Sequence, residues 1–353
     1  MTDVSLSRLP RAVLQIALVI GFVALLHFGK GLLLPLVVAG LLAALLDPVH
    51  EKLMAWGLPS GLAIAVCLLI LLTVFGGLFT AIGQQASAFS DNWPETQEKL
   101  TREISSLRTN YGLEGIIPET KGKTLTGDGD EEGIMDQLPT GDTSILGFIT
   151  ATFGVLGDFM LTLIYIILLL TQKQRLREFF LRLMPDEHRG TTHQTMNESR
   201  DVVQKYLRGY LIVIAVLAVL YSVGFLISGL EYAILIAALA ASLSIIPYLG
   251  NIIAGLFAIA LAYSSGGETS AVFGVVITMS LAQVLESYVL TPLVVGDEVS
   301  LNPLATIICV VGMGYLWGPV GAIVGIPLFA ILRIVCSHVK GMEPYAYLLG
   351  HEK

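Results

Sequence analysis

Two polar side chains, Gln283 and Glu286, lie three residues apart in a segment that is otherwise strongly apolar. Because three residues is close to one helical turn, a helix would present the amide and the carboxylate on one face. A carboxylate inside such a segment is costly and is by default a functional candidate. We expect this pair to bind a polyhydroxylated ligand or to carry a proton. The alternative is a carboxylate near a helix end that meets water or pairs with a basic side chain.

A second isolated carboxylate, Asp158, lies near the middle of the apolar run 145–171. The same cost of burying charge predicts that its side chain faces the interior of a helix bundle. Two roles fit this position: a place on an ion or solute pathway, or a structural hydrogen bond between helices.

The remaining candidates lie where proline and glycine interrupt apolar segments. Proline removes a backbone donor and clashes with the preceding turn. Interrupted backbone at membrane depth is tolerated only where protein or a water-filled cavity covers it. These interruptions therefore predict a shielded path for polar solute, with the following candidate residues: Pro247, Tyr248, Gly250, Asn251, Pro292, Asn302, Pro303, Gly318 and Pro319.

Some of these residues have a simpler interpretation. For Asn302 we favour a helix cap ahead of Pro303 over ligand contact. Pro247 and Asn251 can form an ordinary interhelical turn, and Trp317 with Pro319 can form a turn that carries an interfacial aromatic side chain.

Enzyme-type motifs are absent from the sequence. It contains no metal-ligand spacing, glycine-rich phosphate loop or nucleophile elbow. The three cysteines lie in apolar runs and are expected to be small core residues. We therefore expect no catalytic residue, no metal, no cofactor and no nucleic-acid partner.

The composition is that of a membrane protein. Of the 353 residues, 54% are hydrophobic and 14% are charged, against about 25% charged in soluble domains. The length and number of the apolar runs predict an all-α, polytopic transmembrane helix bundle. Interrupted or re-entrant helices are expected in its C-terminal third.

Charge divides the chain into alternating segments. Residues 84–144 carry five Lys or Arg and twelve Asp or Glu, whereas 172–208 carry eight Lys or Arg. Because basic segments stay on the cytoplasmic side, both termini are predicted to be cytoplasmic. The predicted division is three spans in 1–83, an extracytoplasmic amphipathic helix (94–110) and mobile loop in 84–144, a fourth span in 145–171, a basic amphipathic cytoplasmic region in 172–206, a transport core in 207–340 and a tail in 341–353.

Two regions of the predicted core remain ambiguous. Residues 232–263 and 304–335 each contain two apolar pieces that are short for a bilayer core of about 30 Å at about 1.5 Å per residue. Each region is either a re-entrant hairpin or a pair of full crossings.

Three stretches resemble one family of bacterial membrane proteins. They are 165–185, 246–251 and 283–327; the last contains Glu286, Pro292, Gly296, Asn302-Pro303, Gly318, Gly321 and Pro327. Together they are similar to the autoinducer-2 exporter (AI-2E) family, which includes PerM-type permeases. One departure is Leu168–Gln172, which replaces an Asp-containing end of the fourth span. The resemblance implies a transporter of the bacterial cytoplasmic (inner) membrane, with about eight spans and assembly as a homo-oligomer.

Three functions follow as hypotheses. The favoured one is export of a small polar organic solute, such as an autoinducer-2-like signal, with Glu286 or Asp158 coupling a proton or cation. The alternatives are a sodium/proton antiporter and a membrane scaffold that transports nothing. The expected partners are the lipid bilayer, the solute or cation, and further copies of the chain.

Overall fold

The structure is a computed structural model that describes residues 11–77, 80, 145–230, 232–244, 249–264, 269–295 and 301–350. Within these residues the ordered elements are helices, and the β-structure is one isolated bridge between Leu301 and Gly350. In the part of the chain that the structure describes, six helices are long and apolar enough to cross a membrane, and further apolar helices are shorter. The prediction of an all-α polytopic bundle is confirmed.

The chain forms two compact units. Unit 1 comprises Met1–Ile64, Asp158–Leu207 and Asp297–Lys353, and unit 2 comprises Ala65–Gly157 and Arg208–Gly296. The predicted amphipathic helix at 94–110, the loop that follows it, Pro247 and Tyr248 lie outside the described residues. The predicted division of the chain into membrane spans, loops, a transport core and a tail stays a prediction.

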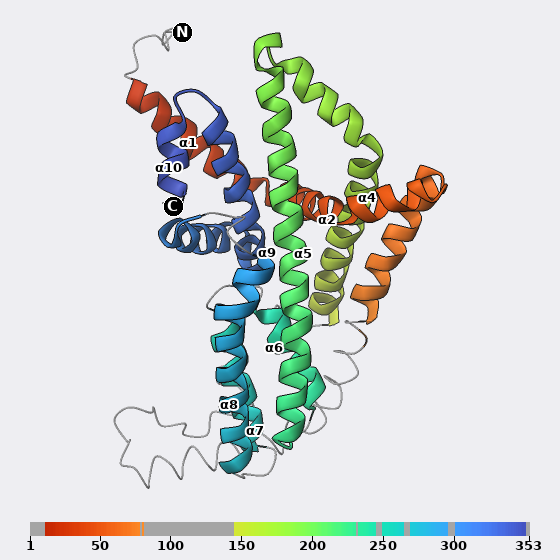
Figure 1. Ribbon diagram of the computed structural model, residues 1–353, viewed down its shortest axis with the longest axis vertical. Helices are drawn as coiled ribbons and strands as arrows, with labels where there is room; N and C mark the ends of the chain where they lie inside the picture. Colours follow the sequence, from red (N-terminus) through yellow and green to blue (C-terminus); the bar gives the residue numbers. More distant parts are fainter. Residues whose placement is uncertain are drawn as a thin grey trace. The chain divides into compact units, whose positions relative to one another are not determined.

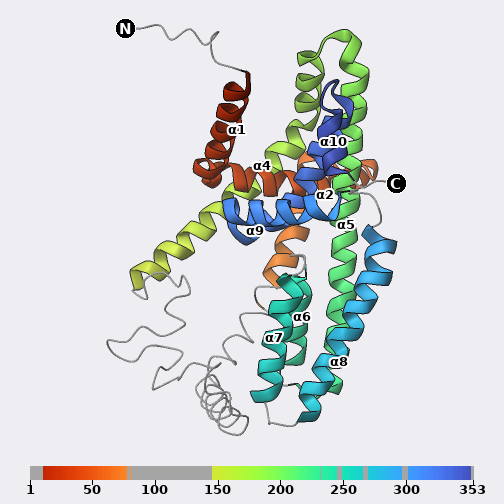
Figure 2. The same ribbon diagram turned by 90° about the vertical axis from the view of Figure 1, so that its left-hand side faces the viewer.

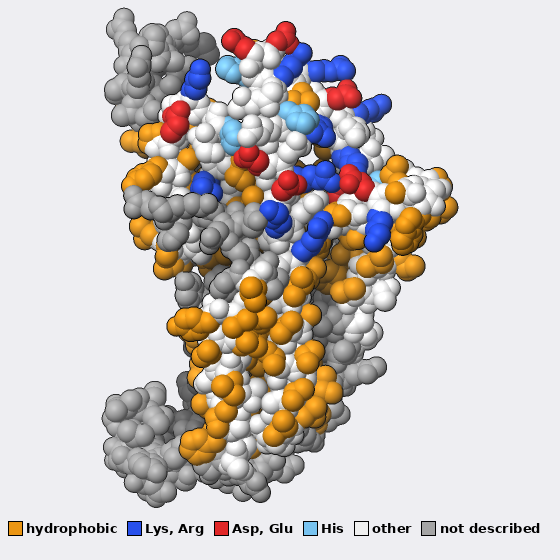
Figure 3. All heavy atoms as spheres, viewed as in Figure 1, with side chains coloured by type: hydrophobic (Ala, Val, Ile, Leu, Met, Phe, Trp, Pro, Cys, Tyr) orange, Lys and Arg blue, Asp and Glu red, His pale blue; other side chains and the backbone are white. Residues whose placement is uncertain are grey.

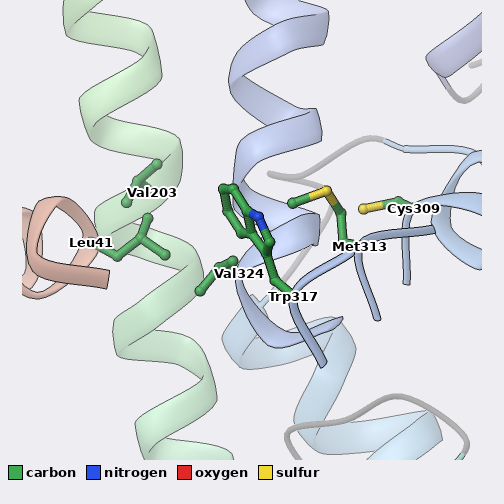
Figure 4. Packing of buried hydrophobic residues seen from close by; sticks show 6 residues of the cluster. All are labelled: Leu41, Val203, Cys309, Met313, Trp317 and Val324. Carbon is green, nitrogen blue, oxygen red and sulfur yellow. The ribbon is translucent and has the colours of Figure 1, made fainter. Parts of the chain in front are cut away.

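Unit 1 combines N-terminal, central and C-terminal helices (Figures 1 and 2). Its elements are α1 (Arg11–Phe28), α2 (Lys30–Ala55), most of α4 (Ile145–Leu183), η2 (Asp186–His188), the first half of α5 (Arg189–Ile227), α9 (Pro303–His338) and α10 (Glu343–Leu349). A hydrophobic cluster joins three of these helices, α2, α5 and α9. It consists of Leu41, Val203, Cys309, Met313, Trp317 and Val324 (Figure 4).

Two helices are longer than the apolar pattern predicts. Helix α2 continues through the polar stretch 47–55 and through Pro48, and α4 continues through the basic stretch 172–183. Polar residues do not end these two helices, because Lys, Arg, Gln and Glu are good helix formers. The basic helix predicted from residue 172 onward is the end of α4. The rest of the basic segment is the first half of α5, which continues into the following apolar run.

Helix α9 is two arms joined at Gly318, whose φ of 68° and ψ of −158° are non-helical. Pro319 follows directly, and Gly321 and Gly325 let the second arm approach the first closely. A Cβ on Gly321 would lie 2.1 Å from the Met313 carbonyl oxygen, and one on Gly325 would lie 2.8 Å from Cys309 Sγ. The two arms therefore pack tightly against each other. The choice between a re-entrant hairpin and two full crossings stays a prediction.

Unit 2 contains the end of α5 and a run of shorter helices. These are α6 (Ala233–Leu243), α7 (Leu249–Ser264), α8 (Thr269–Leu285) and the π-helix η3 (Glu286–Val295). Helix α7 contacts α6 and α8, as Figure 2 shows. At 11 residues, α6 rises about 16 Å, which is too short for a bilayer core and favours a hairpin.

Candidate solute-binding site

Three of the predicted pathway residues meet in unit 2. The Asn251 side chain donates from Nδ2 to Gln283 Oε1 at 2.5 Å and to Glu286 Oε2 at 3.1 Å. Gln283 in turn donates from Nε2 to Ser287 Oγ at 3.0 Å. We call Asn251, Gln283 and Glu286 the Asn251 cluster. It lies where the first turn of α7 meets the end of α8 and the start of η3.

Gly250 holds Asn251 in place. A Cβ on this buried glycine would lie 1.8 Å from the Leu243 carbonyl oxygen, at the end of α6. Only glycine lets the backbone of α7 start this close to α6, since a Cβ contact under about 3 Å forces the structure to shift. Gly250 was predicted to lie at a helix interruption, and the close packing of α6 and α7 explains why glycine is needed there. By allowing this packing, Gly250 sets the position of the Asn251 side chain.

One polar atom of the cluster has no partner. Asn251 Oδ1 is buried and accepts no hydrogen bond from the described residues. A buried acceptor without a donor costs about 1–3 kcal/mol. Glu286 is half-buried and Gln283 is exposed. The cluster therefore offers a carboxylate and an unsatisfied carbonyl oxygen, which can accept hydrogen bonds from hydroxyls or ligate a small cation.

The segment that begins at Glu286 has an unusual backbone conformation. Residues Glu286–Val295 form a π-helix that includes Pro292. The helix interruption predicted around Pro292 takes the form of a change from α-helix to π-helix, and the π-helix continues past the proline. π-helical turns are rare and are frequent at functional sites, and this one begins at the carboxylate of the cluster.

Asp158 lies on α4 and is the first residue of the part of this helix that belongs to unit 1. Its side chain is exposed on the surface of the chain. The expectation that it faces the interior of the bundle therefore does not hold within one chain. A role on a pathway stays a prediction for this residue.

Asn302 caps a helix, as favoured from the sequence. Its Oδ1 accepts from Ala305 N at 2.7 Å, and Pro303 occupies the first turn of α9. Its Nδ2 also donates to the Leu348 carbonyl oxygen at 2.6 Å, and its backbone N–H donates to Leu349 O at 3.0 Å. Asn302 therefore ties α10 to the start of α9.

Gly318 and Pro319 form the turn between the arms of α9. The expectation of an interfacial aromatic here was wrong, because Trp317 is buried and donates from Nε1 to the Leu26 carbonyl oxygen at 2.9 Å. That contact fixes the end of α1 to the turn of α9, both within unit 1.

An ion-pair network in unit 1 was missed. Asp47 contacts Lys173 at 2.7 Å and Arg200 at 2.5 Å, and Glu51 contacts the same two cations at 3.1 Å each. We call these four residues the Asp47 network. The available signal was the four-residue spacing of Asp47 and Glu51, which places both on one face of a helix. Their partners are more than 120 residues away, which no local pattern reveals.

An all-α bundle of apolar helices with a carboxylate–amide cluster at the ends of its helices is typical of membrane transport proteins. The chain belongs to the AI-2E family: the model of the AI-2E family transporter matches residues 16–341. It is therefore a multi-pass membrane transporter, and both the transport prediction and the family resemblance are confirmed.

Named relatives match along most of the chain. PerM of Escherichia coli (strain K12) is 26% identical over 345 residues, which cover 92% of each chain. The AI-2 transport protein TqsA of the same strain is 21% identical over 348 residues, which cover 96% of each. YueF of Bacillus subtilis (strain 168) is 22% identical over 314 residues, 87% of this chain and 84% of YueF.

Proposed function

We propose that the protein exports a small polar organic solute across the bacterial cytoplasmic membrane and binds it at the Asn251 cluster. The observation that carries the proposal is the pairing of Asn251 with Gln283 and Glu286, three polar side chains from separate helical elements. The name of the relative TqsA supports autoinducer-2 as the first solute to test.

The chemistry of the cluster suits a solute with several hydroxyl groups. The Glu286 carboxylate accepts hydrogen bonds from hydroxyls, and charge-assisted bonds of this kind are about twice as strong as neutral ones. The solute also supplies the donor that Asn251 Oδ1 lacks. Binding therefore removes a cost of about 1–3 kcal/mol that the empty site carries.

Coupling to a proton or cation is assigned to Glu286. Its protonation changes the charge of the cluster and thereby the affinity for solute. Asp158 is the second carboxylate proposed for coupling, at a different place in the chain. Each is tested by its own amide variant.

Sodium/proton antiport is the second candidate function. The unsatisfied Asn251 Oδ1 and the Glu286 carboxylate are hard oxygen ligands, which suit a small hard cation. In that case reconstituted protein exchanges sodium for protons with no organic solute present.

Orientation and assembly belong to the same proposal. Both termini are assigned to the cytoplasm, because the basic side chains of 172–208 keep that segment inside. Reporter fusions at the C-terminus and within 118–142 test this assignment. Assembly as a homo-oligomer stays a prediction, which light scattering of the purified protein measures.

The solute is best identified in cells. Metabolites in the medium are compared between cells that express the wild-type protein, cells that express Glu286→Gln, and cells without the protein. The proposal expects at least one small polar compound that accumulates with the wild type and not with Glu286→Gln at equal membrane abundance. Identical profiles for all three strains contradict export of an organic solute.

A further inference from the structure

A second feature of unit 1 lies beside the Asp47 network. It is a hollow of about 200 Å³ lined by Asp47, Glu51, Lys173, Gln174, Arg177, Met196, Asn197 and Arg200. At about 30 Å³ per water, it has room for roughly six waters or one compact polyatomic ion. We call it the Arg177 hollow.

The charges of the hollow do not balance. Its lining has three cations and two carboxylates, which leaves one positive charge in excess. Lys173 and Arg200 are paired with Asp47 and Glu51. Arg177 forms no ion pair with a carboxylate among the described residues, so the excess charge belongs to it.

Neither hydrogen-bond partner of Arg177 is a carboxylate. Its guanidinium contacts His193 Nε2 at 2.5 Å and donates to Asn197 Oδ1 at 3.0 Å, both across the turn between α4 and α5. These contacts orient Arg177 and leave its charge uncompensated.

Among the buried side-chain atoms of the lining, the one without a hydrogen-bond partner among the described residues is a donor. Arg200 Nε is buried and has no hydrogen-bond partner among the described residues. Both oxygens of Asp47, in contrast, are occupied by cations. An anion with several oxygens supplies what this lining lacks, namely a negative charge and acceptors.

We propose that the Arg177 hollow binds a phosphate group, with Arg177 as its principal ligand. A guanidinium matches phosphate oxygens with two parallel donors. Figure 3 shows the Lys, Arg, Asp and Glu side chains gathered around α4 and α5 of unit 1. Basic pockets next to apolar spans bind anionic headgroups. The phosphate therefore comes from a lipid headgroup or from a free phosphate compound, and the experiment separates these two sources.

The test measures thermal unfolding of the purified protein in a neutral detergent. One arm adds sodium phosphate, with sodium chloride at equal ionic strength as its reference. The other arm adds phosphatidylglycerol, with phosphatidylcholine as its reference. A ligand that binds only the folded state raises Tm, and we expect a rise of about 2 °C or more in at least one arm.

The key variant is Arg177→Gln, and Arg182→Gln is its control. Arg182 lies on the same helix, pairs with Glu178 at 3.1 Å and does not line the hollow. We expect about tenfold weaker anion affinity for Arg177→Gln, the effect of losing one charge-assisted bond, and unchanged affinity for Arg182→Gln. Arg177→Lys keeps the charge and is expected to keep part of the affinity if the glutamine variant does not fold.

Each result of the thermal-unfolding test either identifies the source of the phosphate or overturns the proposal. A rise with phosphatidylglycerol alone assigns the site to a lipid headgroup, and a rise with phosphate alone assigns it to a soluble phosphate compound. A rise in both arms supports a general phosphate site. The proposal is overturned if the wild type gains no stability in either arm, or if Arg177→Gln and Arg182→Gln respond as the wild type does.

Discussion

The Asn251 cluster of unit 2 and the Asp47 network of unit 1 both gather polar side chains from several helices, but they differ in what they leave unsatisfied. In the Asn251 cluster one carboxylate meets two amides, no cation is present among the described residues, and a buried acceptor stays open. In the Asp47 network two carboxylates bridge two cations. The ion pairs of the Asp47 network hold helices together and leave one buried donor, Arg200 Nε, open, whereas the Asn251 cluster leaves a buried acceptor open.

The first prediction tests whether the Asp47 network holds unit 1 together. Asp47→Asn removes the charge that Lys173 and Arg200 share. We expect a loss of about 3 kcal/mol in the free energy of unfolding, at the low end for a broken buried pair. The low end applies because the Lys173 and Arg200 side chains are 32% and 39% exposed.

Thermal or denaturant unfolding in detergent measures this loss. Glu51→Gln is the matched control, because its side chain is 52% exposed against 12% for Asp47. Exposed pairs contribute about 0–1 kcal/mol, so the control is expected to be mild. Equal losses for the two variants, or none for Asp47→Asn, would mean that the network does not stabilise unit 1.

The second prediction concerns the geometry of the Asn251 cluster. Gly250→Ala places a Cβ 1.8 Å from the Leu243 carbonyl oxygen, so α6 and α7 must separate. We expect destabilisation of about 1–3 kcal/mol, as for other overpacked sites, together with loss of transport.

Gly255→Ala, on the same helix, is the control for this variant. Its Cβ would meet only Met279, at 3.5 Å, which is an ordinary contact. Normal stability and transport are expected for it. If Gly250→Ala also behaves like the wild type, then the close approach of α6 and α7 does not position the site.

The third and smallest effect concerns Asn302. Asn302→Ala removes both the cap of α9 and the bond to Leu348 O, and we expect a loss of about 1 kcal/mol. Asn302→Asp keeps an oxygen for the cap and loses the donor to Leu348, so it separates the two roles. Proteolysis near α10 measures the tether, and thermal unfolding measures the cap. Protection of α10 in Asn302→Asp equal to the wild type would show that the tether contributes nothing.

The separation of contacting residues along the chain explains which features of both sites the sequence could predict. Local patterns identified the shared face of Gln283 and Glu286, the cap at Asn302 and the apolar spans, because each depends on residues a few positions apart. They could not show that Asn251 bonds to Gln283 and Glu286, which lie 32 and 35 residues away. The Asp47 network joins residues still further apart.

Other errors have local causes. The change from apolar to polar residues in α2 and α4 did not show where these helices end, because Lys, Arg and Glu favour helices. Pro292 was expected to interrupt a helix, but no sequence pattern indicated that the interruption is a π-helix that begins at Glu286. Trp317 was expected at an interface, but its indole N–H bonds to a distant carbonyl oxygen inside unit 1.

The most direct test of the account is autoinducer-2 efflux from proteoliposomes that contain the wild type, Glu286→Gln or Glu178→Gln. Glu178 is an exposed carboxylate on α4 that pairs with Arg182, so its variant controls for the loss of one charge. The account predicts efflux with the wild type and Glu178→Gln, and at least tenfold slower efflux with Glu286→Gln, equivalent to about 1.4 kcal/mol. Equal efflux from all three, at any imposed pH gradient, would contradict a role for the Asn251 cluster in transport.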